Sequence, residues 1–228
     1  MVKPWVLGSD PLPGTWTPGG PPQVWLLRIA SGEPEAGEVL VLDEAERARA
    51  AGFVRDLHRT RYVAAHLGLR RLLGAYLGVP AADVLLTREP CPLCGGPHGR
   101  PAVTGAPLHF NLSHAGDLAL FGFADVAVGV DVEELPGADV VADVARTLHP
   151  HETAELAALP EAERVLGFAR CWTRKEAYLK GTGTGLAQSP ALTYVGTGAE
   201  LAGVPAGWAL RDVPVDDGYV AAVATRSA

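Results

Sequence analysis

The 228-residue sequence predicts an α+β fold, because strands and long amphipathic helices occur in both halves of the chain. In the first half, residues 24–30 alternate in hydropathy as a strand does, and residues 60–77 have the apolar spacing of a helix. In the second half, a helix over residues 161–180 precedes strands around 207–212 and 218–224. The order strand, helix, strand is therefore expected twice.

Local signals define the other predicted elements. Residues 8–22 are dense in glycine and proline and predict a loop or a wrapped arm. Asp43 and Glu46 have the spacing of a capping box, which begins a short helix. Gly78 and Pro80 end the long helix of the first half. The remaining predicted elements are strands at 84–87, 118–124, 126–133 and 191–195 and a helix at 150–159.

Composition and charge limit the class of protein. Hydrophobic residues make up 48% of the chain and charged residues 20%, so a substantial core can be buried. The net charge of −7 argues against general nucleic-acid binding. Residues 44–71 nevertheless hold seven arginines against three acids, a local charge of +4 that leaves −11 for the remainder. This segment predicts a basic surface that steers an anionic partner, with a solvated arginine-rich helix face as the alternative.

No sequence feature indicates export or membrane insertion. The first residues lack a continuous apolar stretch, so no signal peptide is evident. Asp117 and Asp125 bracket the apolar run 118–124, which is too short to span a bilayer. We therefore expect a cytoplasmic protein, monomeric, with no membrane or nucleic-acid partner.

Lysine is rare in this chain, and its distribution marks one segment. Only three lysines occur against sixteen arginines, and Lys175 and Lys180 both lie in residues 172–180, beside Glu176. A lysine ammonium is a compact point charge that can lose its proton, whereas arginine keeps a fixed planar charge. This segment is the first candidate for an active site.

Glu176 interrupts the apolar face of the helix that Pro160 and Gly181 are predicted to bracket. A carboxylate that faces inward is costly unless it is paired, protonated or bound to a metal. The alternative is an ordinary surface pair with Lys180 at i, i+4. The apolar residues that share the face of Glu176 are Val165, Ala169, Trp172 and Leu179.

A second acidic pattern lies in the predicted strand 126–133. The period of two puts Gly129, Asp131 and Glu133 on one face and three valines on the other. Paired carboxylates of this kind suit Mg²⁺, which completes its octahedron with water and phosphate oxygens. The alternative is a solvated edge strand. Together with the inward Glu176, the pattern favours the metal site.

A third segment is Phe-Asn-Leu-Ser-His at 110–114, followed by Ala-Gly-Asp. Small polar side chains, a histidine and a glycine at a turn can donate several hydrogen bonds to a phosphate. The same residue types are common in ordinary turns, so this segment alone indicates little.

The three segments together resemble the ordered motifs of 4′-phosphopantetheinyl transferases. The motifs are Phe-Asn-Leu-Ser-His at 110–114, Gly-Val-Asp-Val-Glu at 129–133 and Trp-Thr-Arg-Lys-Glu-Ala-Tyr-Leu-Lys at 172–180. The chain length indicates the two-lobed Sfp type rather than the short trimeric type. This resemblance implies two similar α/β lobes related by a pseudo-twofold axis, residues 1–124 and 125–228, with coenzyme A in the cleft between them.

The resemblance also implies roles for individual residues. The implied metal ligands are Asp131, Glu176 and, directly or through water, Glu133. The implied catalytic residues are Glu176, Lys180 and Glu152, the last as the base that takes the serine proton, whose removal should cost about a hundredfold or more in rate. Arg100 departs from many relatives, which carry lysine there. The implied coenzyme A contacts are Arg49, Arg88, His98, Gly99, Arg100, Ser113, His114, Lys175 and Lys180.

The implied reaction moves the phosphopantetheine arm of coenzyme A to a serine of an acyl, peptidyl or aryl carrier protein, with Mg²⁺ or Mn²⁺. Adenosine 3′,5′-bisphosphate leaves. Such transfer depends on positioning and on cationic stabilisation of phosphate oxygens. Two alternatives stay open: a silent module that binds coenzyme A or a carrier protein, and a magnesium-dependent nucleotide hydrolase.

The cysteines form half of a zinc pattern. Cys91-Pro-Leu-Cys94 is followed by His98, yet no second Cys-x-x-Cys occurs and Cys171 lies on the predicted helix 161–180. The sequence therefore favours a reduced loop leading into the His98 turn over a zinc site.

Overall fold

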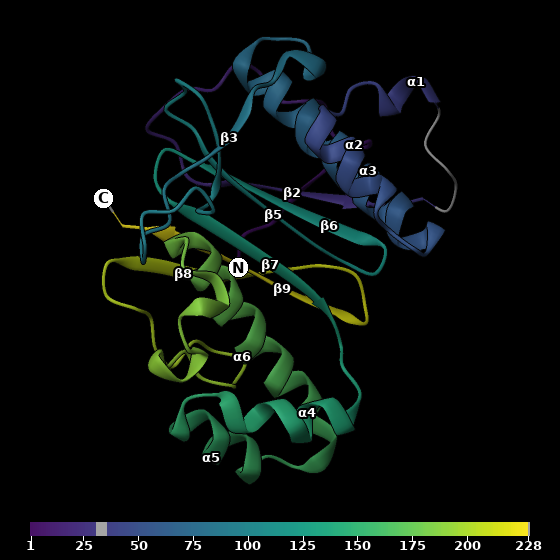
Figure 1. Ribbon diagram of the computed structural model, residues 1–228. Helices are drawn as coiled ribbons and strands as arrows, with labels where there is room; N and C mark the ends of the chain where they lie inside the picture. Colours follow the sequence, from purple (N-terminus) through teal and green to yellow (C-terminus); the bar gives the residue numbers. More distant parts are fainter. Residues whose placement is uncertain (31–35, 228) are drawn as a thin grey trace.

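The computed structural model describes residues 1–30 and 36–227, and it contains three β-sheets (Figure 1). The first sheet has four strands in the order β1-β2-β6-β5: Trp5–Val6, Gln23–Arg28, Leu118–Ala124 and His109–Ala115. The second has three strands in the order β7-β9-β8: Val128–Glu134, Tyr219–Arg226 and Trp208–Val213. A separate hairpin joins β3 (Leu86–Arg88) to β4 (Pro101–Val103). The mixed α+β class that the sequence predicts is confirmed.

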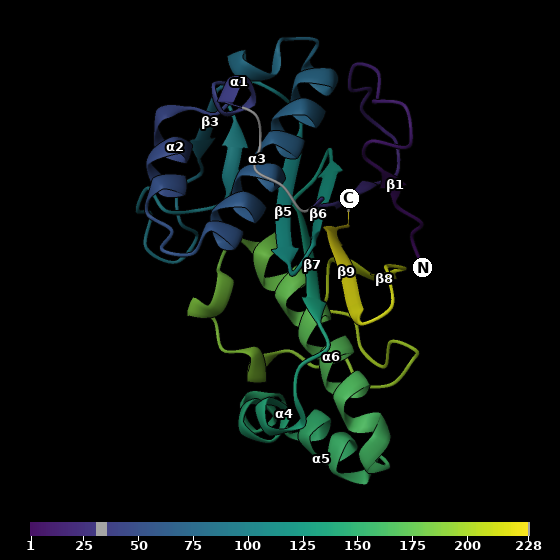
Figure 2. The same cartoon turned by 90° about the vertical axis from the view of Figure 1, so that its right-hand side faces the viewer.

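Helices cover the outer faces of the two larger sheets (Figures 1 and 2). Helix α3 (Asp56–Leu77) packs on the first sheet, with α2 (Glu44–Ala51) and the short α1 (Ala36–Val39) beside it. Helix α6 (Glu161–Thr182) packs on β7 and β9 of the second sheet. Helices α4 (Ala138–Val144) and α5 (Pro150–Ala158) contact α6. The core is thus layered helix, sheet, sheet, helix.

Side-chain alternation along the strands fills the space between these layers. On β7, Val128, Val130 and Val132 are buried against Leu118 and Leu120 of β6, and this apolar contact joins the two sheets. On the opposite face of β7, Gly129 and Asp131 are buried beneath α6. The solvated edge strand is therefore the wrong interpretation of this acidic pattern, since a helix covers its polar face.

Two side chains link the sheets where β5 passes β7. The Asn111 side-chain oxygen accepts a hydrogen bond from Val130 N at 3.0 Å, and Ser113 Oγ accepts one from Val132 N at 3.4 Å. Both acceptors are buried. No continuous backbone ladder joins the two sheets among the described residues, so these polar side chains set the position of β7 relative to β5.

The C-terminal end of α6 differs from the prediction. Gly181 lies inside the helix, which continues to Thr182 and ends at Gly183, whose φ is 79°. The reason is packing: a Cβ on Gly181 would lie 2.6 Å from the Trp208 ring. Facing it, a Cβ on Gly129 would overlap the α6 backbone at Ala177 and Gly181. This pair of glycines lets helix and strand approach closely.

Most of the other predicted elements are confirmed within one to four residues at their ends. Asp43 and Glu46 form the predicted capping box of α2. The prediction of a strand at 191–195 is wrong, because Pro190–Leu192 forms a 3₁₀ turn. Residues 110–114, for which no helix or strand was predicted, belong to strand β5. None of the helices in the described ranges has the length and apolarity needed to cross a membrane.

Candidate active site

Three elements bring a group of polar side chains together between the sheets and α6. Asp131 on β7 is 1% exposed, and its Oδ1 accepts hydrogen bonds from Lys180 Nζ at 2.6 Å and from Ser113 Oγ at 2.9 Å. Lys180 also donates to Ser113 Oγ at 2.9 Å. The ion pair of Lys180 is therefore with Asp131, and the ordinary i, i+4 pair with Glu176 is not its main contact. We call Asp131, Glu176, Lys180 and Ser113 the carboxylate–lysine group.

Two carboxylate oxygens of this group lack hydrogen-bond partners. Among the described residues, the buried side-chain oxygens and nitrogens without a partner are Asp131 Oδ2 and Glu176 Oε1. Glu176 is 8% exposed, as expected for an acid on the inner face of α6. A buried carboxylate oxygen without a partner costs stability unless a proton or a cation satisfies it. Both oxygens belong to side chains that interact electrostatically with each other.

The acids of the site have raised pKa values. Burial raises the pKa of Asp131, although the Lys180 ammonium and the Ser113 hydroxyl oppose the shift. Burial and the negative charge of Asp131 raise the pKa of Glu176. Burial, together with the charges of Asp131 and Glu176, raises the pKa of Glu133 to about 7. Three acids that resist ionisation together form an environment in which a divalent cation would be favourable.

The donor set fits Mg²⁺. Carboxylate oxygens are hard ligands, and Mg²⁺ takes one or two of them and fills its other positions with water and phosphate. Asp131 and Glu176 would supply those two. Glu133 is half-buried, and its oxygens do not form a close cluster of three with the other two acids. This arrangement suits a contact between Glu133 and the ion through water.

Glu152 and Lys175 lie outside this group. The two side chains are fully buried, and Lys175 Nζ lies 2.7 Å from Glu152 Oε2. Glu152 also accepts hydrogen bonds from the backbone N–H groups of His149, Val195 and Gly196. Both of its oxygens are engaged and 0% of the residue is exposed, so a substrate hydroxyl cannot reach it in this conformation. The role of Glu152 as the base therefore stays a prediction.

The partners of Lys175 lie outside the carboxylate–lysine group. Its ammonium donates to Pro190 O at 2.9 Å and to Thr193 O, in addition to pairing with Glu152. Lys175 and Glu176 are neighbours on α6, and consecutive helical side chains point in different directions. These are the partners of Lys175 in this structure, and its contact with a coenzyme phosphate stays a prediction.

A pocket of about 690 Å³ holds two of the predicted coenzyme contacts, Arg49 and Arg88. It lies between helices α2 and α3 and strands β3, β4 and β5, and Tyr62, His66 and Phe110 also line it. The volume is in the range of pockets for cofactors. Arg49 stacks over Phe53 at 5.4 Å, and Arg88 donates to Gly99 O at 3.1 Å.

The predicted contacts at 98–100 lie in the connection between β3 and β4. Arg100 donates to both the Glu89 carboxylate, at 2.6 Å, and Gly181 O of α6, also at 2.6 Å. His98 Nε2 lies 3.0 Å from Cys94 Sγ. Arg100 therefore ties this hairpin to α6, and His98 faces a thiol of its own turn.

Ser113 and His114 point to opposite faces of β5. Ser113 joins the carboxylate–lysine group, where its Oγ donates a hydrogen bond to Asp131 Oδ1. Burial lowers the pKa of His114, as do the charges of His66 and Lys180. Successive side chains along a strand point to opposite faces of the sheet, so Ser113 and His114 have different surroundings although they are neighbours in the sequence.

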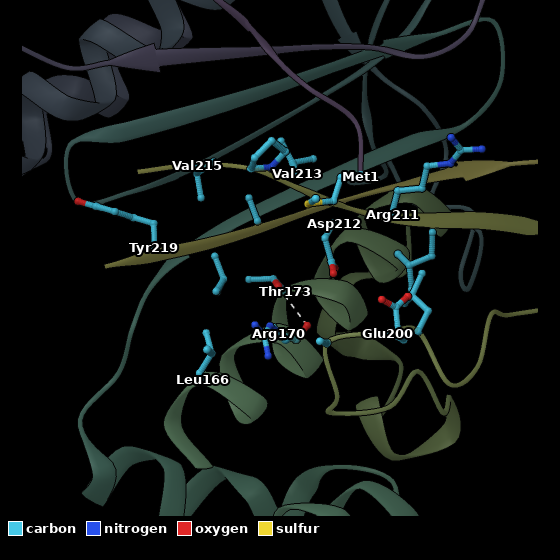
Figure 3. Close-up of a pocket in the computed structure, with 16 residues that line it drawn as sticks. Met1, Leu166, Arg170, Thr173, Glu200, Arg211, Asp212, Val213, Val215 and Tyr219 are labelled. Carbon is cyan, nitrogen blue, oxygen red and sulfur yellow. Dashed lines mark hydrogen bonds between the residues drawn. The ribbon is translucent and has the colours of Figure 1, made fainter. Parts of the chain in front are cut away.

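A second cavity, of about 660 Å³, lies between α6, β8 and β9 and the N-terminus (Figure 3). Met1, Arg170, Glu200 and Arg211 line it, and none of the predicted site residues does. Asp212, at its wall, is bound by the buried Arg174. This cavity is separate from the carboxylate–lysine group.

Sequence comparison identifies the family. A model described as the 4′-phosphopantetheinyl transferase superfamily matches residues 127–206, which include Asp131, Glu176 and Lys180. The 4′-phosphopantetheinyl transferase HetI of Nostoc sp. is 37% identical over 226 residues, 92% of this chain and 93% of HetI. The chain belongs to the 4′-phosphopantetheinyl transferase family. The resemblance inferred from three short motifs is thereby confirmed.

Other relatives carry the same family name over shorter regions. The transferase psf-1 of Bacillus pumilus is 31% identical over 143 residues, 62% of this chain and 56% of psf-1. AcpT of Salmonella typhimurium is 40% identical over 109 residues, 45% of this chain and 57% of AcpT. Membership of the family supports a transferase that acts on carrier proteins.

Two contributors to the site had no assigned role in the sequence. Asn111 accepts a hydrogen bond from the backbone of β7, and the Trp172 side chain lies beside Glu133, whose pKa it lowers against the larger raising effect of burial. Both lie inside the recognised motifs at 110–114 and 172–180. The motifs were therefore the sequence signal that could have identified Asn111 and Trp172 as site residues. Their contacts, however, are determined only by the folded structure.

Proposed function

We propose that this protein transfers the 4′-phosphopantetheine arm of coenzyme A to a serine of an apo acyl, peptidyl or aryl carrier protein. The serine oxygen would attack the β-phosphorus, and adenosine 3′,5′-bisphosphate would leave. The observation that supports this proposal is the pair of buried, unpartnered oxygens on Asp131 and Glu176 beside the Lys180 ammonium. An anionic diphosphate is the kind of ligand that a cation and a lysine attract together.

Each member of the carboxylate–lysine group has a role in this proposal. Asp131 and Glu176 would hold Mg²⁺, or Mn²⁺, with Glu133 acting through water. The ion supplies charge for orienting the diphosphate and stabilising its oxygens. Lys180 would contact the phosphate oxygens on which charge develops, and Ser113 would hold Asp131 in place. Arg49 and Arg88 would contact the nucleotide end of coenzyme A in their pocket.

We further infer the two-lobed arrangement, with one lobe over residues 1–124 and the other over 125–228. Two 22-residue helices, α3 and α6, each pack on a separate sheet, which supports this division. The boundary near Asp125 would fall between β6 and β7. The substrate coenzyme would lie where the lobes meet.

The test is to incubate the protein with coenzyme A, Mg²⁺ and an apo carrier protein and to measure the mass of the carrier. A gain equal to the phosphopantetheine arm is expected, and a chelator should prevent it. Glu176→Gln should abolish the gain with an unchanged circular dichroism spectrum. Glu163→Gln, an exposed change on the same helix, should leave the gain unchanged.

The alternatives give different results in the same experiment. Coenzyme binding without any mass gain would indicate a silent binding module. Coenzyme cleavage without a modified carrier would indicate a hydrolase. Full activity of Glu176→Gln would remove that residue from the metal site.

A further inference from the structure

The connection between β3 and β4 brings together three metal-binding side chains outside the carboxylate–lysine group. Cys91 Sγ, Cys94 Sγ and a ring nitrogen of His98 all lie within 4.8 Å of one another. Within the described residues, this is the group of His, Cys, Asp and Glu donors that is compact enough to hold an ion through three or more ligands. All three cysteines of the chain are free thiols.

The backbone of this turn is shaped around the three donors. Cys91 N donates to Gly96 O at 2.7 Å, and Gly95 N donates to Cys91 O at 2.8 Å, which closes a tight turn. Gly95 has a φ of 72°, a conformation that glycine adopts without strain. A Cβ on Gly96 would lie 3.0 Å from the His98 ring and 3.3 Å from Cys94 Sγ. The two glycines therefore leave the space in which thiol and imidazole meet.

The chemistry of the donors selects the ion. Thiolate and imidazole together favour Zn²⁺ over Mg²⁺ or Ca²⁺, which prefer oxygen. His98 presents Nε2 to Cys94 at 3.0 Å, so this nitrogen is the one aimed at the shared centre.

We propose that Cys91, Cys94 and His98 bind one Zn²⁺ that stabilises the turn between β3 and β4. In a tetrahedral site the sulfur and nitrogen ligands lie about 3.5 Å apart, so the Cys94–His98 pair opens by roughly 0.5 Å to admit the ion. Cys94 and His98 are exposed, which leaves the fourth position to water. Cys171 is 0% exposed on α6 and takes no part.

The position of this turn explains what the ion would stabilise. Glu89 and Arg100 pair through their backbones directly outside the turn, and Arg100 reaches Gly181 O of α6. A bound ion would restrict the backbone of this connection. Without the ion, the connection would lose more conformational entropy when Arg100 binds Gly181 O. The inference is independent of the proposed transferase activity.

Elemental analysis of protein purified without chelator, with any affinity tag removed, tests the site. One zinc per chain is expected, and Cys94→Ser and His98→Gln should each reduce the content at least tenfold. Cys171→Ala and His109→Gln are matched controls, which remove a thiol and a nearby imidazole outside the group, and both should keep one zinc. Zinc retained by Cys94→Ser would overturn the proposal.

Two measurements on the unchanged protein guard against misfolded variants. Removal of zinc by a chelator should make two further thiols reactive toward a thiol reagent, and replacement by Co²⁺ should give the visible absorption of tetrahedral thiolate coordination. A disulfide between Cys91 and Cys94, or protein that stays without metal after incubation with equimolar zinc, would show that the turn is not a zinc site.

Discussion

At the scale of single residues, the buried charged side chains in the described part of the chain divide into two kinds. In some, every polar atom has a hydrogen-bond partner, and in others a buried oxygen has none. Arg174 is fully buried and donates to Asp212 and to three backbone carbonyls. Glu152 and Lys175 likewise satisfy each other and the neighbouring backbone. Asp131 and Glu176 are buried to a similar degree, yet each keeps an open oxygen. The open atoms, rather than burial itself, distinguish the candidate site.

The Glu152–Lys175 pair gives the first prediction. Lys175→Met should destabilise the fold by about 3–5 kcal/mol, because it leaves a buried carboxylate without its counter-ion. The double variant Glu152→Gln/Lys175→Met should recover much of this loss, as coupled neighbours do. Urea unfolding of the two single variants and the double variant measures the coupling. A Glu152→Gln variant with full stability and a hundredfold slower transfer would instead support the base role.

A second prediction concerns pH. Burial raises the pKa of Glu46, but hydrogen bonds from His66, from the Asp43 backbone and from Arg70 outweigh it, so the pKa lies below its ordinary 4.5. A lowered folded-state pKa contributes stability that is present above the unfolded pKa and is lost as pH falls through the folded one. Wild-type protein should therefore lose this contribution below about pH 4.5.

Glu46→Gln should lower stability at pH 7 by on the order of 3 kcal/mol, because Arg70 is 1% exposed and loses one of its two acidic partners. The variant should then lose less stability than wild type between pH 7 and pH 3. Denaturant unfolding at a series of pH values measures both effects, with the exposed Glu44→Gln as the control. Parallel curves for wild type and Glu46→Gln would contradict this account.

At the scale of elements, the contact of α6 with β7 positions the site. The acidic face of β7 meets the face of α6 that carries Glu176 and Lys180, and Gly129 and Gly181 set how closely the two backbones approach. With larger residues there, the helix would stand further from the strand. Lys180 then could not reach Asp131 at the present 2.6 Å.

Gly129→Ala tests this contact. Its Cβ would overlap backbone atoms of α6, which no side-chain rotation relieves, so we expect a loss of more than about 3 kcal/mol in unfolding free energy. Gly14→Ala, with no atom within 4 Å of the added Cβ, should change stability by less than about 0.5 kcal/mol. Equal effects of the two substitutions would show that α6 can shift without cost.

At the scale of the whole molecule, the two sheets are held together by an apolar layer and by buried polar side chains of β5. Asn111→Ala should therefore cost about 1–3 kcal/mol, because it leaves the buried Val130 N–H without an acceptor. Thermal unfolding of the variant, with Gly14→Ala as reference, measures the loss. An unchanged unfolding temperature would mean that a water or a neighbouring group replaces the amide oxygen.

In the folded molecule, several arginines of the basic segment 44–71 form ion pairs with acidic side chains. Arg59, Arg61, Arg70 and Arg71 pair with Asp56, Asp117, Glu46 and Glu38, and Arg70 also pairs with Asp43. Such pairs reduce the charge that a partner would meet at this surface. Arg49 lines the pocket beside α2 and is the member of this segment with a proposed coenzyme contact.

The sequence by itself determined the α+β class, the boundaries of most helices and strands, and the motifs that identify the family. Hydropathy periodicity, capping residues and motif spacing are local, so they can be read along the chain. The inward direction of Asp131 and Glu176 was predicted in this way. The pseudo-twofold relation of the lobes and the roles of the site residues remain predictions.

Only the tertiary structure decided which charges meet. Lys180 pairs with Asp131 across two elements, while Glu152 and Lys175 bury each other, and no spacing along the sequence distinguishes these outcomes. The same holds for Gly181, whose place inside α6 depends on Trp208 and Gly129. The sequence pattern of Cys91, Cys94 and His98 was not sufficient to predict a zinc site. The folded turn brings their ligand atoms together, and this makes them a candidate zinc site. Contacts between distant residues depend on packing, which is a property of the whole chain.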